Sequence, residues 1–282
     1  MEGIERYDRN RLILRSRLID SLVRIDNHVT RQLHSINDSQ TCYPNATGLN
    51  VEEVRIGFLV IILNLKIAES LADRFPDLRV QVIEINGLRV ALEDPKLEEF
   101  KTQVFADLRN KYTLESLKDQ TVFRSYRDFF WKVGVDPTKT RPAAEALIRR
   151  VLGGRTIPRI NTAVDAYNLA SMTTCVALAA FDLDRIDGDV TMRFADGGEA
   201  FHGIGMNKTT VLAGGEVVMA DNSRLIAVYP YRDADYSKID LQTTAMMLVS
   251  CGVPGVSLGL LGEAAEKACG FVTRFCDGKT SN

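Results

Sequence analysis

Apolar residues recur at helical spacing near the start of the chain. Between residues 11 and 35 they stand three or four positions apart, and this period predicts an amphipathic helix. After a loop rich in turn-forming residues, Asn50 and Glu53 make a capping box that predicts a second helix over about 51–74. Together these patterns predict an N-terminal helical extension over residues 1–75.

The pattern changes after Pro76. The segment 78–85 is rich in β-branched residues and partly alternates, which predicts a strand. Asp94-Pro95 is a typical N-cap followed by a typical first helical residue, so a helix is expected to start there. The helices expected in this part of the chain cover about 95–111, 120–133 and 142–152, with a further one capped by Asn161.

Short strands separated by glycine-containing turns dominate from residue 176. The expected strands cover 176–181, 189–195, 198–204, 215–220, 224–231 and 244–250, and a final helix covers about 260–276. Helices followed by strands are typical of an α+β fold, whereas regular alternation would indicate parallel βαβ units. The sequence therefore predicts an α+β domain over residues 76–282 behind the helical extension.

The net charge of −2 means that any contact with a nucleic acid has to use a local patch. Residues 120–160 offer such a patch, because they carry nine Lys or Arg against three Asp or Glu. Arg141, Arg149 and Arg150 are its candidate phosphate contacts. Five aromatic residues accompany these cations: Phe123, Tyr126, Phe129, Phe130 and Trp131. The segment could bind RNA, or it could be a solvated helix face whose aromatic residues lie in the core.

Other classes of site find little support in the sequence. The longest apolar run, Ile56 to Leu65, has ten residues, whereas a membrane span needs about 20. The three His residues lack the spacing of metal ligands, and no glycine-rich phosphate or dinucleotide loop occurs, so neither a metal nor another cofactor is expected. Five cysteines without a CxxC pair indicate reduced thiols and predict a cytoplasmic protein.

Asn168 is a polar residue inside the largely apolar segment AVDAYNLASM. Asp165 and Ser171 lie three residues before and after it, so a helix would place all three side chains on one face. Two interpretations stay open at this point. The three residues form either a buried polar network that fixes the helix or part of a pocket for a small polar ligand.

Several longer motifs resemble a known family. Residues 126–201 resemble the B3/B4 domain of the bacterial phenylalanyl-tRNA synthetase β subunit. The resemblance to free-standing B3/B4 proteins is closer, because those proteins share, in the same order and spacing, the motifs WKVGVDPTKTRPAAEALIRR, PRINTAVDAYNLAS, FDLDRIDGD, GEVVMAD and YRDADYSKI. It covers about residues 76–282 and implies a mixed sheet flanked by helices, while residues 1–75 lie outside it.

In the synthetase, the B3/B4 domain hydrolyses tyrosine that has been mischarged on the phenylalanine tRNA. The chain has no room for the catalytic core of a synthetase, so the resemblance implies an aminoacyl-tRNA deacylase that binds charged tRNA and edits in trans. Three alternatives stay open: a non-catalytic RNA-binding module, a transferase that passes the aminoacyl group to another acceptor, and a structural partner without RNA.

The resemblance also implies which residues form the pocket. Asn168 matches an Asn of the editing pocket, whereas Tyr167 replaces its Thr and Ala179 replaces its His. The bulkier Tyr167 is expected to exclude a large aromatic side chain and to favour a smaller amino acid. Further candidate pocket residues are Asp165, Ser171, Glu199 and Asp221.

Overall fold

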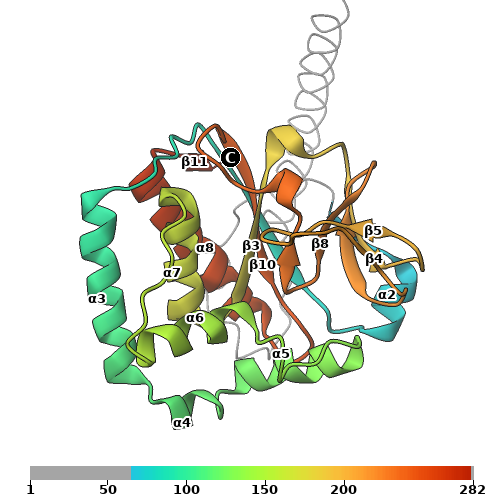
Figure 1. Cartoon of the computed structure of the whole chain (residues 1–282), viewed down its shortest axis with the longest axis horizontal. Coiled ribbons are helices and arrows are strands. Elements are labelled where there is room, and N and C mark those ends of the chain that lie inside the picture. The colour runs from blue at the N-terminus through green and yellow to red at the C-terminus, as the bar shows by residue number, and fades with distance from the viewer. Residues whose placement is uncertain (1–64, 281–282) are drawn as a thin grey trace, which may run out of the picture. The chain divides into compact units, whose positions relative to one another are not determined.

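Two β-sheets lie against each other in the computed structural model, which describes residues 65–280 (Figure 1). The first sheet has the antiparallel order β11-β2-β10-β3, and the second has the order β1-β4-β7-β8-β9 with one parallel pair, β1 and β4. The strands are β1 (Leu65–Ile67), β2 (Val80–Asn86), β3 (Ala177–Asp182), β4 (Val190–Phe194), β5 (Ala200–Phe201), β6 (Thr210–Val211), β7 (Val217–Ala220), β8 (Leu225–Val228), β9 (Arg232–Asp233), β10 (Ala245–Cys251) and β11 (Lys279–Thr280). Strands β5 and β6 form a separate small ribbon.

Helices cover the face of the first sheet that points away from the second. Helix α8 packs on β2 and β10 and lies alongside α7, which in turn contacts β3, α3 and α6. The helices are α2 (Glu69–Arg74), α3 (Pro95–Lys111), α4 (Leu114–Leu117), α5 (Thr121–Lys132), α6 (Ala143–Leu152), α7 (Thr162–Thr174) and α8 (Leu258–Cys276). The predicted α+β class and the predicted mixed sheet flanked by helices are confirmed.

The helix starts follow capping signals that are visible in the sequence. The Asp94 side chain accepts a hydrogen bond from the Leu97 N–H at 2.9 Å, and α3 begins at the proline that follows. The Asn161 side chain accepts one from the Val164 N–H at 2.9 Å and starts α7. Just after α5, Gly134 adopts a φ of +78°, which suits glycine. The predictions of α3, α5, α6, α7 and α8 are confirmed to within a few residues.

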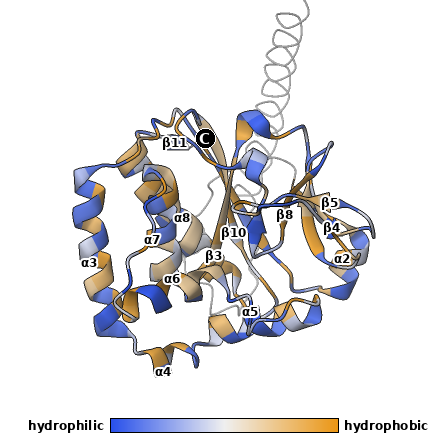
Figure 2. Cartoon of the chain, viewed as in Figure 1, coloured by the Kyte–Doolittle hydropathy of each residue, from blue (hydrophilic) through white to orange (hydrophobic). Residues whose placement is uncertain are grey.

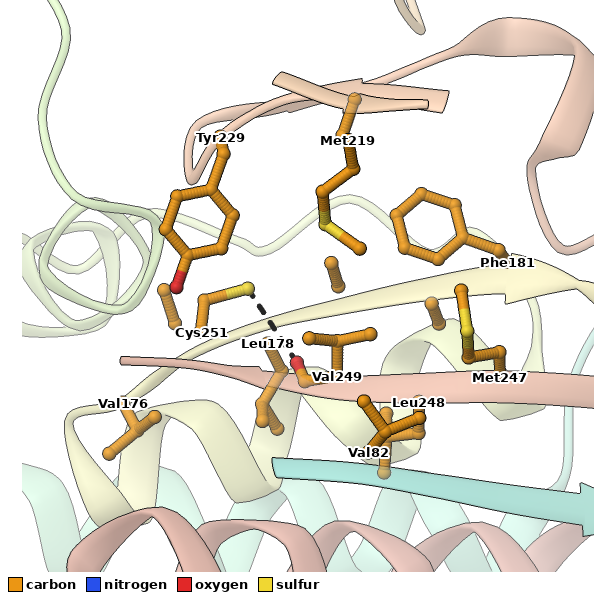
Figure 3. Packing of buried hydrophobic residues seen from close by; sticks show 14 of the residues in the cluster. Val82, Val176, Leu178, Phe181, Met219, Tyr229, Met247, Leu248, Val249 and Cys251 are labelled. Atoms are coloured by element: carbon orange, nitrogen blue, oxygen red, sulfur yellow. Dashed lines mark hydrogen bonds between the residues drawn. The ribbon is translucent and has the colours of Figure 1, made fainter. Parts of the chain in front are cut away.

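Strands β3 and β10 lie between the helices and the second sheet, which explains their continuous apolar sequences. Every residue of β3 is buried. Phe181 and Tyr229 lie on the side of the second sheet, whereas Val82 and Leu248 lie on the helix side (Figure 3). Hydrophobic residues accordingly concentrate on β10 and α8 (Figure 2). The removal of this apolar surface from water is the main stabilising term of the domain.

The spacing of apolar residues gave a partly wrong prediction at the start of the domain. The helix expected over 51–74 is confirmed for Glu69–Arg74 and wrong for residues 65–68, because Leu65–Ile67 forms β1. Leu71 and Phe75 join the main core, so these residues pack with the domain that follows. A short apolar run suits a strand as well as a helix, and here the pairing with β4 decides.

Several short elements also differ from expectation. The strand expected over 198–204 is reduced to Ala200–Phe201, and α4, β6, β9 and β11 were not predicted. These elements have two to four residues, too few to display a period. The helix predicted at 11–35 and the capping box at Asn50 lie outside the described residues. No helix between residues 65 and 280 is long and apolar enough to cross a membrane.

Candidate functional site

A small pocket lies where the free edge of β3 meets the second sheet. Its volume is about 70 Å³. A single water needs about 10–15 Å³, so the pocket has room for a small side chain or a few waters. Its walls come from the start of α6, from β3, from the end of β10 and from the second sheet: Ala143, Leu178, Ala179, Cys251, Met219, Ala227, Tyr229, Pro230, Tyr231, Arg232 and Asp233.

Backbone groups of β3 face this pocket, because β3 is the edge strand of its sheet. The Tyr126 hydroxyl accepts a hydrogen bond from the Ala177 N–H at 3.0 Å and donates one to the Cys251 carbonyl. Ala177 and Cys251 are register partners, so their backbone groups point at each other across the two strands. Along an antiparallel strand the N–H groups of successive residues point alternately toward the neighbouring strand and away from it. The Ala177 N–H points toward β10, so the N–H groups of Leu178 and Ala180 point away from β10.

Asp233 places a carboxyl group in the pocket from the end of β9. Burial raises the pKa of this carboxyl from its ordinary 3.8 to about 7, while the Ala180 N–H and the Arg232 guanidinium act in the opposite direction. Both the acid and the carboxylate are then populated near neutral pH, which is the condition for efficient proton transfer. Asp233 is therefore the candidate acid–base group of the pocket.

Tyr167 approaches Asp233 from α7. Burial raises the pKa of its phenol, and the charges of Asp233 and Asp165 raise it further. Its hydroxyl has no hydrogen-bond partner within residues 65–280. Burial also raises the pKa of the Cys251 thiol well above its ordinary value, so this thiol stays protonated and is a poor nucleophile. The groups of the pocket wall that remain to meet a ligand are the Asp233 carboxyl and the outward N–H group of Leu178.

The structure separates the three polar residues that were expected to share the pocket. Asp165 is buried and lies 2.6 Å from Lys101 Nζ. Ser171 is buried and donates to the Val176 carbonyl at 2.6 Å. Asn168 is partly exposed, makes no side-chain hydrogen bond within residues 65–280 and does not line the pocket. The contacts of Asp165 and Ser171 favour the interpretation of residues that fix the helix.

Of the other expected pocket residues, Ala179 lines the pocket, whereas Glu199 and Asp221 serve local structure. Glu199 accepts two hydrogen bonds from Arg193, at 2.7 and 2.8 Å, and these hold its pKa below the usual range. Asp221 accepts from two backbone N–H groups of the turn that follows it and from the Tyr236 hydroxyl at 3.0 Å. Both carboxylates thus already have partners.

The three expected phosphate contacts also differ in their surroundings. Arg149 lies 2.9 Å from Glu145, a buried carboxylate that needs a partner. Arg150 donates to the Thr156 carbonyl at 3.1 Å. Arg141 is exposed and has no ion pair within the described part of the chain. Arg141 and Arg150 are both exposed and without an ion pair within the described residues, whereas Arg149 is held by Glu145.

The aromatic residues of the basic segment divide in the same way. Trp131 is 59% exposed. The other four aromatic side chains of the segment are buried: Phe123, Tyr126, Phe129 and Phe130. The core interpretation holds for these four, and only Trp131 is available for stacking on a base.

We expect Asp165→Ala to destabilise the fold. The change leaves Lys101, whose side chain is 12% exposed, without one of its two carboxylate partners, and it removes the acceptor of the Ile160 N–H. Breaking a buried ion pair costs about 3–5 kcal/mol. Because Glu98 stays 2.7 Å from Lys101, we expect the lower end of that range in urea unfolding. Asp165→Asn keeps an acceptor and is the matched control, and a loss for Asp165→Ala below about 1 kcal/mol would contradict this role.

Asp233 is the functional candidate that the sequence does not reveal. It stands in the motif YRDADYSKI two residues before Asp235, which pairs with Lys238 at 2.8 Å, and nothing in the local pattern separates the two acids. The difference is tertiary, because the end of β9 lies at the free edge of β3. No group of three or more His, Cys, Asp or Glu that could hold a metal ion occurs within residues 65–280.

Comparisons with known proteins place the pocket within a defined family model. The model described as B3/4 domain matches residues 125–276, a range that contains every pocket residue named above. The fold also resembles the crystal structure of an N-terminal fragment of the phenylalanyl-tRNA synthetase β-subunit from Pyrococcus horikoshii, with a TM-score of 0.39 and 11% identity. That match covers 77% of this chain and 50% of the fragment, half of its length. No curated protein matches the chain.

Proposed function

Because the chain belongs to the B3/4 domain family, we propose that it binds a charged tRNA and hydrolyses the aminoacyl ester in the pocket beside β3. The resemblance of its sequence to the editing domain of a synthetase supports the substrate class. The observation that carries the proposal is Asp233, a carboxyl with a pKa of about 7 in a pocket bordered by an open strand edge. Such a pocket suits the cleavage of an already activated ester.

The proposed reaction uses Asp233 as a general base. Its carboxylate takes a proton from water while the water oxygen forms a bond to the ester carbonyl carbon. The bond between that carbon and the ribose oxygen then breaks, and the departing ribose oxygen receives the proton from Asp233. The products are a free amino acid and an uncharged tRNA. The pKa of about 7 lets one group perform both transfers.

The edge of β3 supplies a donor for the charge that develops on the ester oxygen. The Leu178 N–H points away from β10 and belongs to a residue that lines the pocket. Preorganised donors of this kind typically contribute about 2.7–4 kcal/mol to a transition state. A backbone donor also explains how the pocket can work with Ala179 in place of a His.

The size of the pocket favours a small amino acid. A volume of about 70 Å³ is well below that of a typical ligand site, which is about 300–1,000 Å³. We therefore expect glycyl, alanyl or seryl esters to be cleaved faster than tyrosyl or phenylalanyl esters.

A deacylation screen tests this function directly. Purified full-length protein is mixed with tRNAs charged with each amino acid in turn, and the release of free amino acid is followed against a protein-free blank. We expect at least one small aminoacyl-tRNA to be cleaved and tyrosyl-tRNA to be spared. Rapid cleavage of tyrosyl-tRNA would contradict the size argument.

The same screen separates the alternatives. Activity that appears only when an amine acceptor is added would indicate a transferase. Tight binding of charged tRNA without any release, with or without an acceptor, would indicate an RNA-binding module, the alternative that Ala179 favours. Either result would overturn the hydrolase proposal.

A further inference from the structure

The short strand that carries Asp233 has a neighbour on each side. Strand β9 pairs with β8 on one side. On the other side lies the segment 202–204, where the Ile204 N–H donates to the Asp233 carbonyl at 2.9 Å and the Asp235 N–H donates to the His202 carbonyl at 3.0 Å. The backbone around the candidate acid–base group is therefore held by this segment as well as by β8.

A tight turn ends this segment. The Met206 N–H donates to the Gly203 carbonyl at 3.0 Å, and the Gly203 N–H donates to Met206 Sδ at 3.2 Å. Gly205, the third residue of the turn, has a φ of +75°, as a type II turn requires. The turn 203–206 therefore has a defined shape that it can pass on to β9.

Arg232 holds this turn against β9. Gly203 forms an antiparallel bridge with Ala234. Alternate residues of a strand share a face, so Arg232 lies on the same face of β9 as Ala234, and Asp233 points to the opposite face. Arg232 Nη1 donates to the Ile204 carbonyl at 2.8 Å. Its stem passes so close to Gly203 that a Cβ there would stand 2.4 Å from Arg232 Cδ and 2.6 Å from Cγ, so only glycine leaves room for the arginine.

We propose that Arg232 and Gly203 form a clamp that presses the turn 203–206 onto β9 and thereby positions Asp233 in the pocket. This inference rests on the proposed function, in which Asp233 is the base, and it makes Arg232 a positioning residue. The base has to lie within hydrogen-bond reach of the attacking water. A misplacement of about 1 Å can lower a rate by about 10²-fold. Strand β9 has two residues, so its pairing with β8 alone supplies few bonds to hold that distance.

Amide hydrogen exchange tests the clamp without reference to the reaction. In the full-length protein, Arg232→Ala removes the donor to the Ile204 carbonyl, so the amides of Ile204 and Asp235 are expected to exchange roughly tenfold to a hundredfold faster, the effect of one lost hydrogen bond from a charged donor. Gly203→Ala is expected to do the same by displacing the arginine. The φ of Gly203 lies outside the left-handed region, so the new methyl group adds no backbone strain.

Two matched controls accompany these variants. Arg89→Ala removes another exposed arginine. Gly259→Ala places a methyl group where no atom of the described residues lies within 4 Å. Neither is expected to change the exchange of the Ile204 and Asp235 amides.

The rate of ester hydrolysis shows whether the clamp positions the base. Both clamp variants are expected to lower the single-turnover rate by roughly tenfold to a hundredfold. The concentration of charged tRNA that gives half the maximal rate is expected to stay unchanged, because a group that only positions the base does not bind the substrate. In the double variant the arginine stem is absent, so Gly203→Ala is expected to add only the effect of its contact with Phe201 Cε1 at 2.9 Å.

The outcomes separate the clamp from the proposed function. Exchange of the Ile204 and Asp235 amides that is no faster in the clamp variants than in the controls would overturn the clamp. Faster exchange with an undiminished rate of hydrolysis would reject the positioning role, and so would fully additive losses in the double variant. Faster exchange in the variants of a protein that hydrolyses no charged tRNA would support the clamp and reject the hydrolase.

Discussion

Asp233→Asn is expected to reduce the single-turnover rate of ester hydrolysis by about 10²- to 10⁴-fold, the usual contribution of a general base. Asn has nearly the same shape and keeps an acceptor for the Ala180 N–H, but it cannot take a proton from water. The measurement is the release of free amino acid from the aminoacyl-tRNA that the screen identifies. Asp233→Glu restores a carboxyl group and is expected to recover part of the rate.

The pH profile gives the same prediction a second, independent readout. Because the base form of Asp233 is the active one, the wild-type rate is expected to rise with pH up to about 7 and then to level off. The Asn variant is expected to lose this inflection after the uncatalysed rate has been subtracted. Asn168→Ala is the control, since Asn168 lies outside the pocket wall. A large loss in Asn168→Ala together with full activity in Asp233→Asn would assign the chemistry to the helix α7 instead.

Local signals account for the parts of the fold that the sequence predicted well. The caps Asp94 and Asn161 each satisfy a backbone N–H within three residues, so the start of α3 and of α7 is decided by chemistry that a short window contains. Strand β1 differs, because Leu65–Ile67 becomes a strand only through its pairing with β4, more than a hundred residues later. The hydrophobic period of a short segment does not show which distant strand the segment will pair with.

At the candidate site, too, local sequence patterns do not show which distant segments come together. The resemblance placed Ala179 in an editing pocket, and Ala179 lines the small pocket beside β3. It also pointed to Asn168, which is not among the residues that line this pocket. The pKa of Asp233 arises from burial where two sheets meet, and the exposure of Trp131 arises from how α5 packs. Both properties belong to the assembled layers, so no residue pattern near either position reveals them.

The unfolding free energy of the protein is also expected to depend on pH through the ionisation of Asp233. The pKa of this carboxyl is about 7 in the folded state against an ordinary 3.8, so the folded state binds the extra proton between these pH values. The contribution of Asp233 to the unfolding free energy therefore falls as pH rises from about 4 to about 7 and is constant above that range. Ionised Asp233 destabilises the fold at pH 8.

Asp233→Asn removes this penalty, so the variant is expected to be more stable than the wild type at pH 8 and similar to it near pH 4. Each pKa unit corresponds to about 1.4 kcal/mol, which sets an upper limit of about 4 kcal/mol. The residue keeps some contact with solvent, so we expect about 1–3 kcal/mol. Urea unfolding of both proteins at several pH values measures the difference.

The comparison between the two proteins isolates Asp233 from the other acids. Glu199, Asp221 and Asp240 have lowered pKa values, so their contributions change with pH in the opposite sense and at lower pH. These contributions are present in both proteins and cancel in the difference. A difference that does not vary between pH 4 and pH 8 would show that the Asp233 carboxyl titrates normally, and it would remove the base on which the proposed hydrolysis depends. A gain in stability at pH 8 together with the loss of hydrolysis would instead identify Asp233 as a residue held at a cost to the fold because the reaction needs it.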